Sequence, residues 1–196
     1  MSRKVKPDRK QQILETLARE LEANPGTRIT TACLAEAVGV SEAALYRHFS
    51  SKAKMFEALI DFTEDSIFGL INKILDREKN VIKRCENIMH IILTFSEKNP
   101  GITRIMAGDA LVGENDRLRL RIVNFFERIE TQFRQVLREA NLSNEVRIEG
   151  AINASANHLT TIIEGKLSQY VRSVFEKKPT DHWQEQWALI VKSLFR

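Results

Sequence analysis

Four prolines and eight glycines are few for a chain of 196 residues, and they fall in small clusters. Because both residue types interrupt regular backbone, their scarcity predicts long helices joined by short connections. No stretch approaches the roughly 18 apolar residues of a membrane-spanning helix. The first residues also lack the apolar core of a signal peptide. We therefore expect a soluble, cytoplasmic protein with no membrane partner.

Cysteine and histidine are also sparse, which limits the chemistry available. Cys33 and Cys85 each fall in an apolar helical pattern, which predicts reduced thiols packed in the core of a cytosolic protein. The four histidines are far apart, and none has a metal-binding spacing with another His, Cys or carboxylate. The glycines form no phosphate-binding loop. We therefore expect no catalytic activity, no bound metal and no cofactor.

Positive charge is concentrated at the start of the chain. Residues 1–60 hold 10 Lys or Arg against 7 Asp or Glu, and residues 61–196 hold 20 against 19, within totals of 30 and 26. Most of the N-terminal surplus comes from Arg3, Lys4, Lys6, Arg9 and Lys10. A basic arm on a nearly neutral body suggests a polyanionic partner, although a solvated tail without a partner has the same composition.

Apolar residues recur every three or four positions along nearly the whole chain, and no segment alternates as a strand does. This periodicity predicts an all-α protein. The expected helices cover about 10–23, 31–38, 41–48, 51–74, 80–97, 102–112, 115–140, 145–174 and a last segment after Pro179-Thr180-Asp181. Asn24-Pro25-Gly26 ends the first helix and Asn99-Pro100-Gly101 ends the fifth.

Two short helices meet at Gly39, which can adopt a positive φ at little cost. Thr30 or Thr31 is placed to cap the first of them, and Ser41 to cap the second. Five apolar residues would hold the pair against the first helix of the chain: Leu34, Val38, Val40, Leu45 and Phe49. This is a helix-turn-helix pattern, whose second helix enters the major groove of DNA. A helical corner in an ordinary bundle is the competing interpretation.

The exposed face of that second helix suits DNA. Tyr46, Arg47 and His48 offer hydrogen-bond donors, while Lys52 and Lys54 follow where they can meet phosphates. Small side chains let the helix approach base edges closely, and their methyl groups can touch thymine. The predicted DNA-binding residues are Thr30, Thr31, Ala32, Ser41, Glu42, Ala43, Ala44, Tyr46, Arg47, His48, Lys52 and Lys54.

The run Ser41-Glu-Ala-Ala-Leu-Tyr-Arg-His-Phe49, followed by Ser51-Lys52 and Phe56, resembles the DNA-binding domain of the TetR family. The resemblance implies three N-terminal helices for DNA and a fourth that leads into an α-helical dimerisation and regulatory domain. We expect the first domain over residues 1–54, with its basic arm, and the second over 55–196.

Further runs, among them 62–66, 97–105, 108–118, 126–139 and 171–173, are similar to the nucleoid occlusion branch of that family. This similarity implies a homodimer on palindromic double-stranded DNA, with room for more than one dimer per site. It also implies a nucleoid-associated protein that binds the division protein FtsZ when bound to DNA, and so antagonises the division ring. Phe62, Lys98 and Asn99 would contact FtsZ, in a groove between the fourth and fifth helices.

The chain departs from that pattern at several positions. Ser50 replaces an expected proline, Leu70 an expected arginine and Thr94 an expected glycine. Lys98 replaces arginine, which keeps the charge but loses bidentate hydrogen bonding. Leu70, Thr94 and Lys98 fall in the region that the resemblance assigns to FtsZ, so they affect that expectation rather than the DNA-binding one.

Two other functions fit parts of the sequence. The aromatic residues of 115–137 could line an inducer cavity, as in a ligand-responsive TetR-type repressor, although core packing and a dimer interface are the favoured explanation. Helices over 115–140 and 145–174 are long enough to pair with their symmetry mates in a four-helix interface. A helical adaptor without a nucleic-acid partner is the third possibility.

Overall fold

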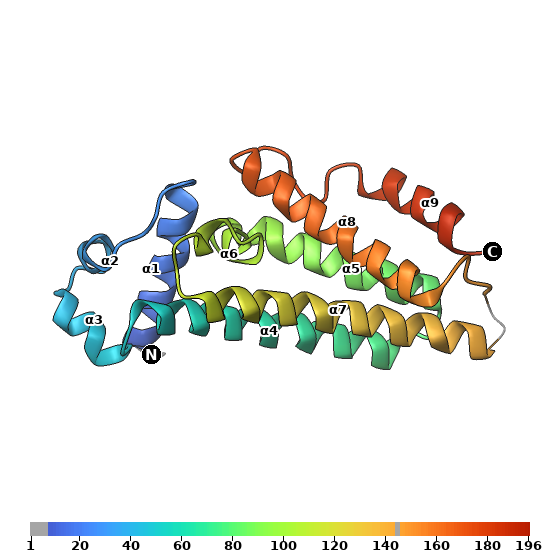
Figure 1. Ribbon diagram of the computed structural model, residues 1–196, viewed down its shortest axis with the longest axis horizontal. Coiled ribbons are helices and arrows are strands. Elements are labelled where there is room, and N and C mark those ends of the chain that lie inside the picture. The colour runs from blue at the N-terminus through green and yellow to red at the C-terminus, as the bar shows by residue number, and fades with distance from the viewer. Residues whose placement is uncertain (1–7, 144–145) are drawn as a thin grey trace, which may run out of the picture.

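The computed structural model describes residues 8–143 and 146–196 and places helices along most of both ranges (Figure 1). The helices are α1 (Arg9–Ala23), α2 (Thr31–Val38), α3 (Glu42–His48), α4 (Lys52–Arg77), α5 (Val81–Lys98), α6 (Pro100–Met106), the short 3₁₀ helix η1 (Asp109–Leu111), α7 (Asp116–Ser143), α8 (Ile152–Arg172) and α9 (Trp183–Leu194). These ranges contain no β-strand, as expected for an all-α protein.

Side-chain caps explain where several helices begin. The side chains of five N-cap residues accept a backbone N–H from the first helical turn: Asp8, Thr30, Ser41, Ser51 and Asn80. Such a cap satisfies one of the backbone donors that a helix start leaves unpaired. Ser51 rather than Ser50 therefore fixes the start of α4, directly behind α3.

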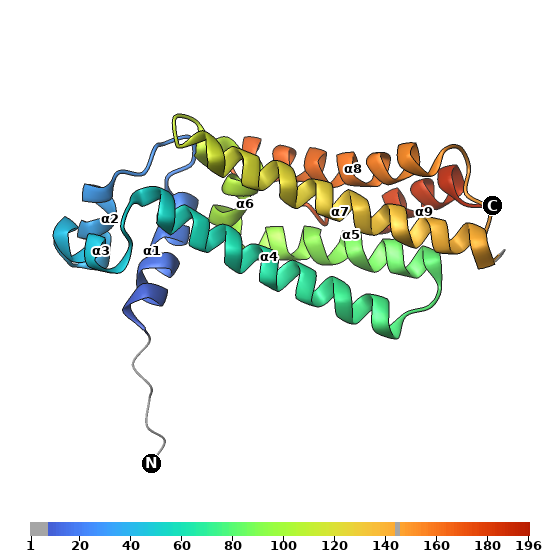
Figure 2. The same cartoon turned by 60° about the horizontal axis from the view of Figure 1, so that its bottom comes forward.

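The helices fall into two parts, which both views separate (Figures 1 and 2). Helices α1, α2 and α3 lie together at one end of the molecule and are called the head below. Helices α4 to α9 form an elongated body, in which α4, α5, α7 and α8 run along the long axis. Helix α4 begins at the head and continues into the body, so it connects the two parts.

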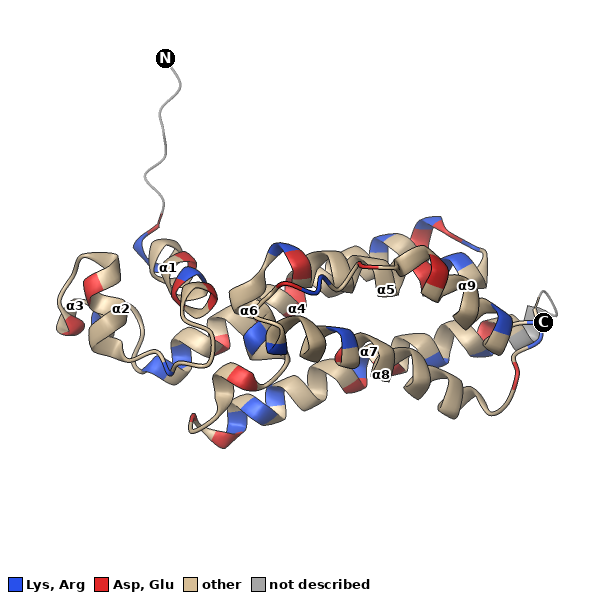
Figure 3. Cartoon of the chain, turned by 90° about the horizontal axis from the view of Figure 1, so that it is seen from above, with Lys and Arg blue, Asp and Glu red and all other residues tan. Residues whose placement is uncertain are grey.

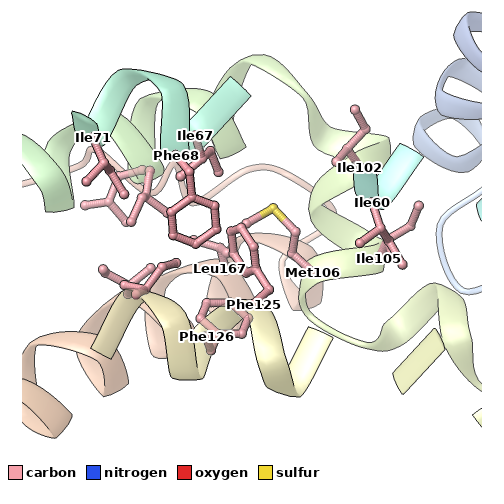
Figure 4. Close-up of a cluster of buried hydrophobic side chains, with 14 of the residues drawn as sticks. Ile60, Ile67, Phe68, Ile71, Ile102, Ile105, Met106, Phe125, Phe126 and Leu167 are labelled. Atoms are coloured by element: carbon pink, nitrogen blue, oxygen red, sulfur yellow. The ribbon is translucent and has the colours of Figure 1, made fainter. Parts of the chain in front are cut away.

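An aromatic cluster fills the centre of the body (Figure 4). The ring of Phe125 packs edge-on against Phe68, with centroids 5.6 Å apart, and against Phe126 at 5.2 Å. The guanidinium of Arg128 lies 3.8 Å from the centroid of the Phe68 ring. The aromatic residues of α7 thus pack mainly against neighbouring side chains, which is the core interpretation of their periodicity.

Helix α8 begins at Ile152, so the predicted start near residue 145 is wrong. Gly150 has a φ of +77°, which ends regular backbone before the helix. Ile148, predicted on the apolar stripe of that helix, instead forms an antiparallel bridge with Phe195 near the C-terminus. Burial of Ile148 therefore comes from an extended segment rather than from a helix face.

Two further predictions need correction. Asn99-Pro100-Gly101 ends α5, but Pro100 also starts α6, because proline is well accommodated at the first helical position. The predicted helix over 102–112 is therefore two shorter pieces, α6 and η1. Cys85 is buried as expected, but Cys33 is exposed, because it lies on the outer face of α2. Among the described helices, none qualifies as a candidate membrane span.

Candidate nucleic-acid interface

Gly39 makes the corner between α2 and α3. It has φ +75° and ψ +40°, a left-handed conformation that favours glycine. The next residue, Val40, donates its backbone N–H to the carbonyl of Ala35 at 2.9 Å, which closes the end of α2. The Ser41 hydroxyl then accepts the N–H of Ala44 at 3.2 Å and starts α3. The predicted glycine-hinged helix pair is confirmed.

The inner faces of α2 and α3 pack on α1. Leu34 and Leu45 are almost fully buried, and Phe49 is buried directly after α3. Val38 and Val40 are half-buried and pack against the same core. All five residues predicted to hold the helix pair therefore contact the hydrophobic core, which leaves the outer face of α3 free of packing.

That outer face carries the predicted DNA-reading side chains. Tyr46 is 44% exposed, although large aromatic residues are usually buried, and Arg47 beside it is also exposed. His48 is half-buried and lines a groove of about 350 Å³ between α3 and the start of α1, together with Arg47 and Ala44. Four of the small or acidic residues predicted in the interface lie exposed on α2 and α3: Ala32, Ser41, Glu42 and Ala43.

Two threonines at the start of α2 make hydrogen bonds within the head. The hydroxyl of Thr30 accepts the backbone N–H of Cys33 at 3.1 Å and caps the helix. The hydroxyl of Thr31 donates to the carboxylate of Glu42 at 2.7 Å. Glu42, the acidic residue in the first turn of α3, is thereby held beside α2. Thr31 and Glu42 thus form one polar pair across the corner.

Lys52 and Lys54, predicted to meet phosphates, both form ion pairs. The ammonium of Lys52 lies 2.5 Å from the Glu114 carboxylate and 5.5 Å from the centroid of the Phe56 ring. Lys54 pairs with Glu57 at 2.7 Å, one turn further along α4. The side chain of Lys52 is only 17% exposed, against 49% for Lys54. Lys54 is therefore the freer of the two cations.

Part of the basic arm lies outside the described residues, namely Arg3, Lys4 and Lys6. Arg9 and Lys10 belong to the first turn of α1. The guanidinium of Arg9 donates to Gln12 at 2.9 Å, and the ammonium of Lys10 lies 6.0 Å from the centroid of the Phe49 ring. These two cations therefore sit on the head, close to the end of α3.

A buried arginine that the sequence analysis did not identify joins the head to the body. Arg104, on α6, has only 1% of its side chain exposed. Its Nη1 donates to the carbonyls of Leu21 and Asn24, each at 2.7 Å, and its Nε donates to Asp109 at 2.5 Å. The bonds hold the end of α1 against α6. The sequence signal was a single arginine in the otherwise uncharged run 102–106, because a buried arginine needs bonded partners.

Gly101 allows the close approach of α6 and α1 that these hydrogen bonds require. A β-carbon at this position would lie 1.9 Å from the carbonyl oxygen of Ala18 and 2.9 Å from its carbonyl carbon. The two backbones are therefore in contact at Gly101. The contact and the Arg104 hydrogen bonds together make α6 the main support of the head.

A groove of about 470 Å³ adjoins the contact between Gly101 and Ala18, and its lining includes all three residues predicted to bind FtsZ. Phe62 is 48% exposed, with its ring 6.4 Å from that of Phe95, and Lys98 is exposed beside it. The side-chain amide of Asn99 donates to the carbonyl of Phe95 at 2.8 Å. Leu70 and Thr94 are not among the residues that line the groove: Gln11, Leu14, Glu15, Ala18, Arg19, Glu22, Leu59, Phe62, Lys98, Asn99, Gly101 and Ile102.

The groove differs in one respect from the predicted site between the fourth and fifth helices. Helix α1 supplies one wall, while α4, the end of α5 and the start of α6 supply the others. Its charged residues include both signs, with Arg19 and Lys98 as cations and Glu15 and Glu22 as anions. The groove is thus shared between the head and the body.

Charges elsewhere on the molecule are mixed. Basic and acidic segments alternate along the body helices (Figure 3), as expected for the balanced composition of residues 61–196. Among the residues that the structure describes, no three His, Cys, Asp or Glu side chains are grouped so that they could hold a metal ion.

Two family models match separate parts of the chain. Residues 13–59 match the bacterial regulatory proteins of the tetR family, and residues 79–195 match the tetracyclin repressor-like, C-terminal domain of the SlmA-like type. The nucleoid occlusion factor SlmA of Marinomonas sp. (strain MWYL1) is 55% identical over 189 residues, covering 96% of both chains. That of Shewanella amazonensis is 52% identical over 196 residues, covering 100% of both.

Solved structures with the same fold are much more distant in sequence. The MbdR regulator from Azoarcus sp. CIB superposes with a TM-score of 0.80 at 14% identity, covering 95% of this chain and 99% of that one. The ketosteroid transcriptional regulator KstR2 of Mycobacterium tuberculosis gives 0.77 at 17%, covering 98% and 97%. At such low identity these similarities establish the fold alone.

Proposed function

The chain belongs to the TetR family of bacterial regulatory proteins, within its SlmA branch, and from this premise we propose that it is a nucleoid occlusion factor that restrains division-ring assembly over chromosomal DNA. Membership of this family makes it a DNA-binding regulator rather than an enzyme. The observation that carries the proposal is the identity of more than half of the residues, over almost the full length, with proteins named for nucleoid occlusion.

In the proposed complex α3 lies in the major groove of two-fold symmetric DNA. The exposed Tyr46 and Arg47 support this assignment, because nothing in the head packs over that face of α3. Ala43 and Ala44 bring the helix axis close to the base edges. Ser41, Glu42 and Ala32 lie at the edge of the same surface, and Thr30 holds α2 in place by its cap.

Thr31, Tyr46, His48, Lys52 and Lys54 are assigned to phosphates, together with the basic arm. Thr31 must turn its hydroxyl away from Glu42 to donate to a phosphate, because a hydroxyl has a single O–H, whereas the three N–H donors of Lys54 allow it to keep its contact with Glu57. Lys52 need not leave Glu114, because an ammonium has three N–H donors and the ion pair uses one. These contacts position the protein and carry no sequence information of their own.

A homodimer would place two heads on one face of the duplex. Helix-turn-helix dimers read half-sites about 34 Å apart, so one head alone covers half of a palindrome. We assign the interface to α7 and α8, which pack side by side along the body (Figures 1 and 2). Leu120 and Val123 on α7 are exposed apolar residues that a partner would cover. More than one dimer on a site is compatible with this arrangement.

The groove that contains Phe62, Lys98 and Asn99 is the proposed FtsZ site. An exposed aromatic ring beside a lysine suits an extended segment of mixed acidic and apolar character. Because α1 forms one wall, the occupant would contact the head and the body together. This arrangement supports antagonism of FtsZ by the DNA-bound protein in particular.

Sedimentation of FtsZ polymers, with and without DNA that the protein binds, tests this proposal. The protein with DNA should reduce the pelleted FtsZ, while Phe62→Ala and Lys98→Asp should bind DNA normally and leave FtsZ in the pellet. Lys79→Asp makes the same charge change on an exposed residue at the far end of the body and should behave as the unchanged protein. If Phe62→Ala and Lys98→Asp bind DNA and still reduce the pelleted FtsZ, the groove assignment is wrong, whereas loss of both activities together in Phe62→Ala would indicate misfolding.

A ligand-responsive repressor is the alternative function. The rings of Phe68, Phe125 and Phe126 pack on one another in the body (Figure 4). Phe126 also borders a pocket of about 350 Å³ between α6, α7 and α8, which is where an inducer would bind. Release of the protein from DNA by a small molecule would favour this alternative over nucleoid occlusion.

A further inference from the structure

The loop between η1 and α7 reaches from the body to the head through one carboxylate. Glu114 has only 7% of its side chain exposed. Its Oε1 accepts from the Nε of Arg28 at 2.9 Å and from the Nζ of Lys52 at 2.5 Å. The Nη2 of Arg28 also donates to the carbonyl of Gly113 at 2.9 Å. Arg28 therefore forms hydrogen bonds with two successive residues of this loop, Gly113 and Glu114.

The two cations bracket the helix-turn-helix pair in the sequence. Arg28 precedes α2, and Lys52 is the first residue of α4, directly behind α3. The single carboxylate of Glu114 therefore holds Arg28, in the segment before α2, and Lys52, at the start of α4, so the loop before α7 contacts both flanks of the α2–α3 unit. Arg104 holds the end of α1 through its hydrogen bonds to Leu21 and Asn24. The head is thus attached at separate points by two oppositely charged residues of the body.

The Glu114 contact depends on negative charge rather than on side-chain shape alone. Hydrogen bonds between ionised partners are roughly twice as strong as neutral ones. The Lys52 side chain is only 17% exposed, so water and salt screen its contact with Glu114 less than that of Arg28, which is 63% exposed. A glutamine has the same length, and its one amide oxygen can still accept from both cations, which share Oε1 of Glu114, but it carries no negative charge to attract them. Glu114→Gln therefore weakens both cation contacts while leaving the packing of the loop intact.

We propose that Glu114 is a positioning residue, which fixes the orientation of α2 and α3 on the body and thereby the half-site spacing that a dimer accepts. The inference rests on the proposed DNA reading by a dimer. Each α3 must enter the major groove on the same face of the duplex, so a rotation of the head changes the distance between the two recognition helices. Two half-sites moved apart by one base pair then fit only if the heads can reorient.

Selection from a pool of random-sequence duplexes, followed by sequencing, measures half-site sequence and spacing in one experiment. The unchanged protein should enrich one palindrome with one spacing, at least about tenfold over the same half-sites one base pair closer or further apart. Glu114→Gln should enrich the same half-site sequence with that preference reduced to roughly threefold or less. Arg28→Gln, which keeps the Lys52 contact, should give an intermediate result.

Asp116→Asn is the matched control, because Asp116 begins α7 two residues after Glu114 and pairs with Arg119 rather than with the head. It should retain the single spacing. The inference is overturned if Glu114→Gln retains the spacing preference, or if it changes the half-site sequence, which would place Glu114 in base recognition. If the unchanged protein enriches no sequence, the proposed function fails instead. Circular-dichroism melting verifies folding, and Arg28→Gln remains decisive if Glu114→Gln does not fold.

Discussion

Substitution of Gly101 by alanine is predicted to destabilise the protein, although alanine is the better helix former. Gly101 lies in the first turn of α6, where α6 touches α1. Replacing glycine by alanine inside an exposed helix usually stabilises a protein by about 0.5–1 kcal/mol. Helix propensity and tertiary contact therefore predict changes of opposite sign at this position.

The geometry decides between these two effects. The alanine Cβ would lie 1.9 Å from the backbone oxygen of Ala18, where a C···O contact of roughly 3.3 Å or more is needed. The two helices must therefore separate by more than about 1 Å, which also lengthens the Arg104 hydrogen bonds to Leu21 and Asn24. Overpacking of this kind costs about 1–3 kcal/mol, so we expect a net loss of about 2 kcal/mol.

Urea unfolding followed by circular dichroism measures this loss, and a melting temperature about 4–8 °C lower should accompany it. Gly69→Ala is the matched control, because Gly69 is an exposed helical glycine on α4 where an added Cβ would meet no neighbouring element within 4 Å. It should leave stability unchanged or raise it by up to about 1 kcal/mol. A Gly101→Ala variant as stable as Gly69→Ala would refute the α1–α6 contact.

Three further predictions concern the head and the cysteines. Tyr46→Ala and Lys52→Ala should weaken binding to all duplex sequences, and Lys52→Ala should also reduce the slope of log K against log salt concentration by about one unit per head. Lys79→Ala should change neither affinity nor slope. Unchanged affinity and slope in both Tyr46→Ala and Lys52→Ala would show that these residues do not contact DNA. Burial raises the pKa of the Cys85 thiol from 9.0 to about 12. Its contribution to the free energy of unfolding is therefore fully present below pH 9.0 and is lost as the pH rises towards 12, because the thiol ionises first in the unfolded state. Urea unfolding at alkaline pH should show this decline, and Cys85→Ala should lack it. A thiol-alkylating reagent should modify the exposed Cys33 rapidly in the native protein and leave Cys85 unmodified, and equal rates would contradict the burial of Cys85.

Most of the fold follows from local signals in the sequence. Apolar spacing identifies the long helices, and side-chain caps such as Ser41 and Ser51 fix where α3 and α4 begin. Gly39 marks the corner of the helix pair because the turn needs a residue with a left-handed backbone conformation, which glycine adopts readily. The exposure of Tyr46 agrees with the DNA-reading assignment, but its role at the duplex remains a prediction.

Long-range contacts are what the sequence could not supply. The bridge between Ile148 and Phe195 joins residues 47 positions apart, so helical periodicity around Ile148 was misleading. The pairing of Lys52 with Glu114 depends on how the start of α4 packs against the loop before α7, and neither residue shows it locally. The exposure of Cys33 has the same origin, because periodicity on a helix of eight residues leaves the buried face poorly defined.

Contact between the outer face of α3 and a duplex is tested most directly by Ala43→Asp. Ala43 is exposed on that face, so a carboxylate there would face base edges and phosphates. Ala151→Asp places the same group at the far end of the body, where it can cap α8. Fluorescence anisotropy on a selected duplex should show about 10- to 100-fold weaker binding for Ala43→Asp and unchanged binding for Ala151→Asp. Equal affinities of Ala43→Asp and the unchanged protein would contradict the account.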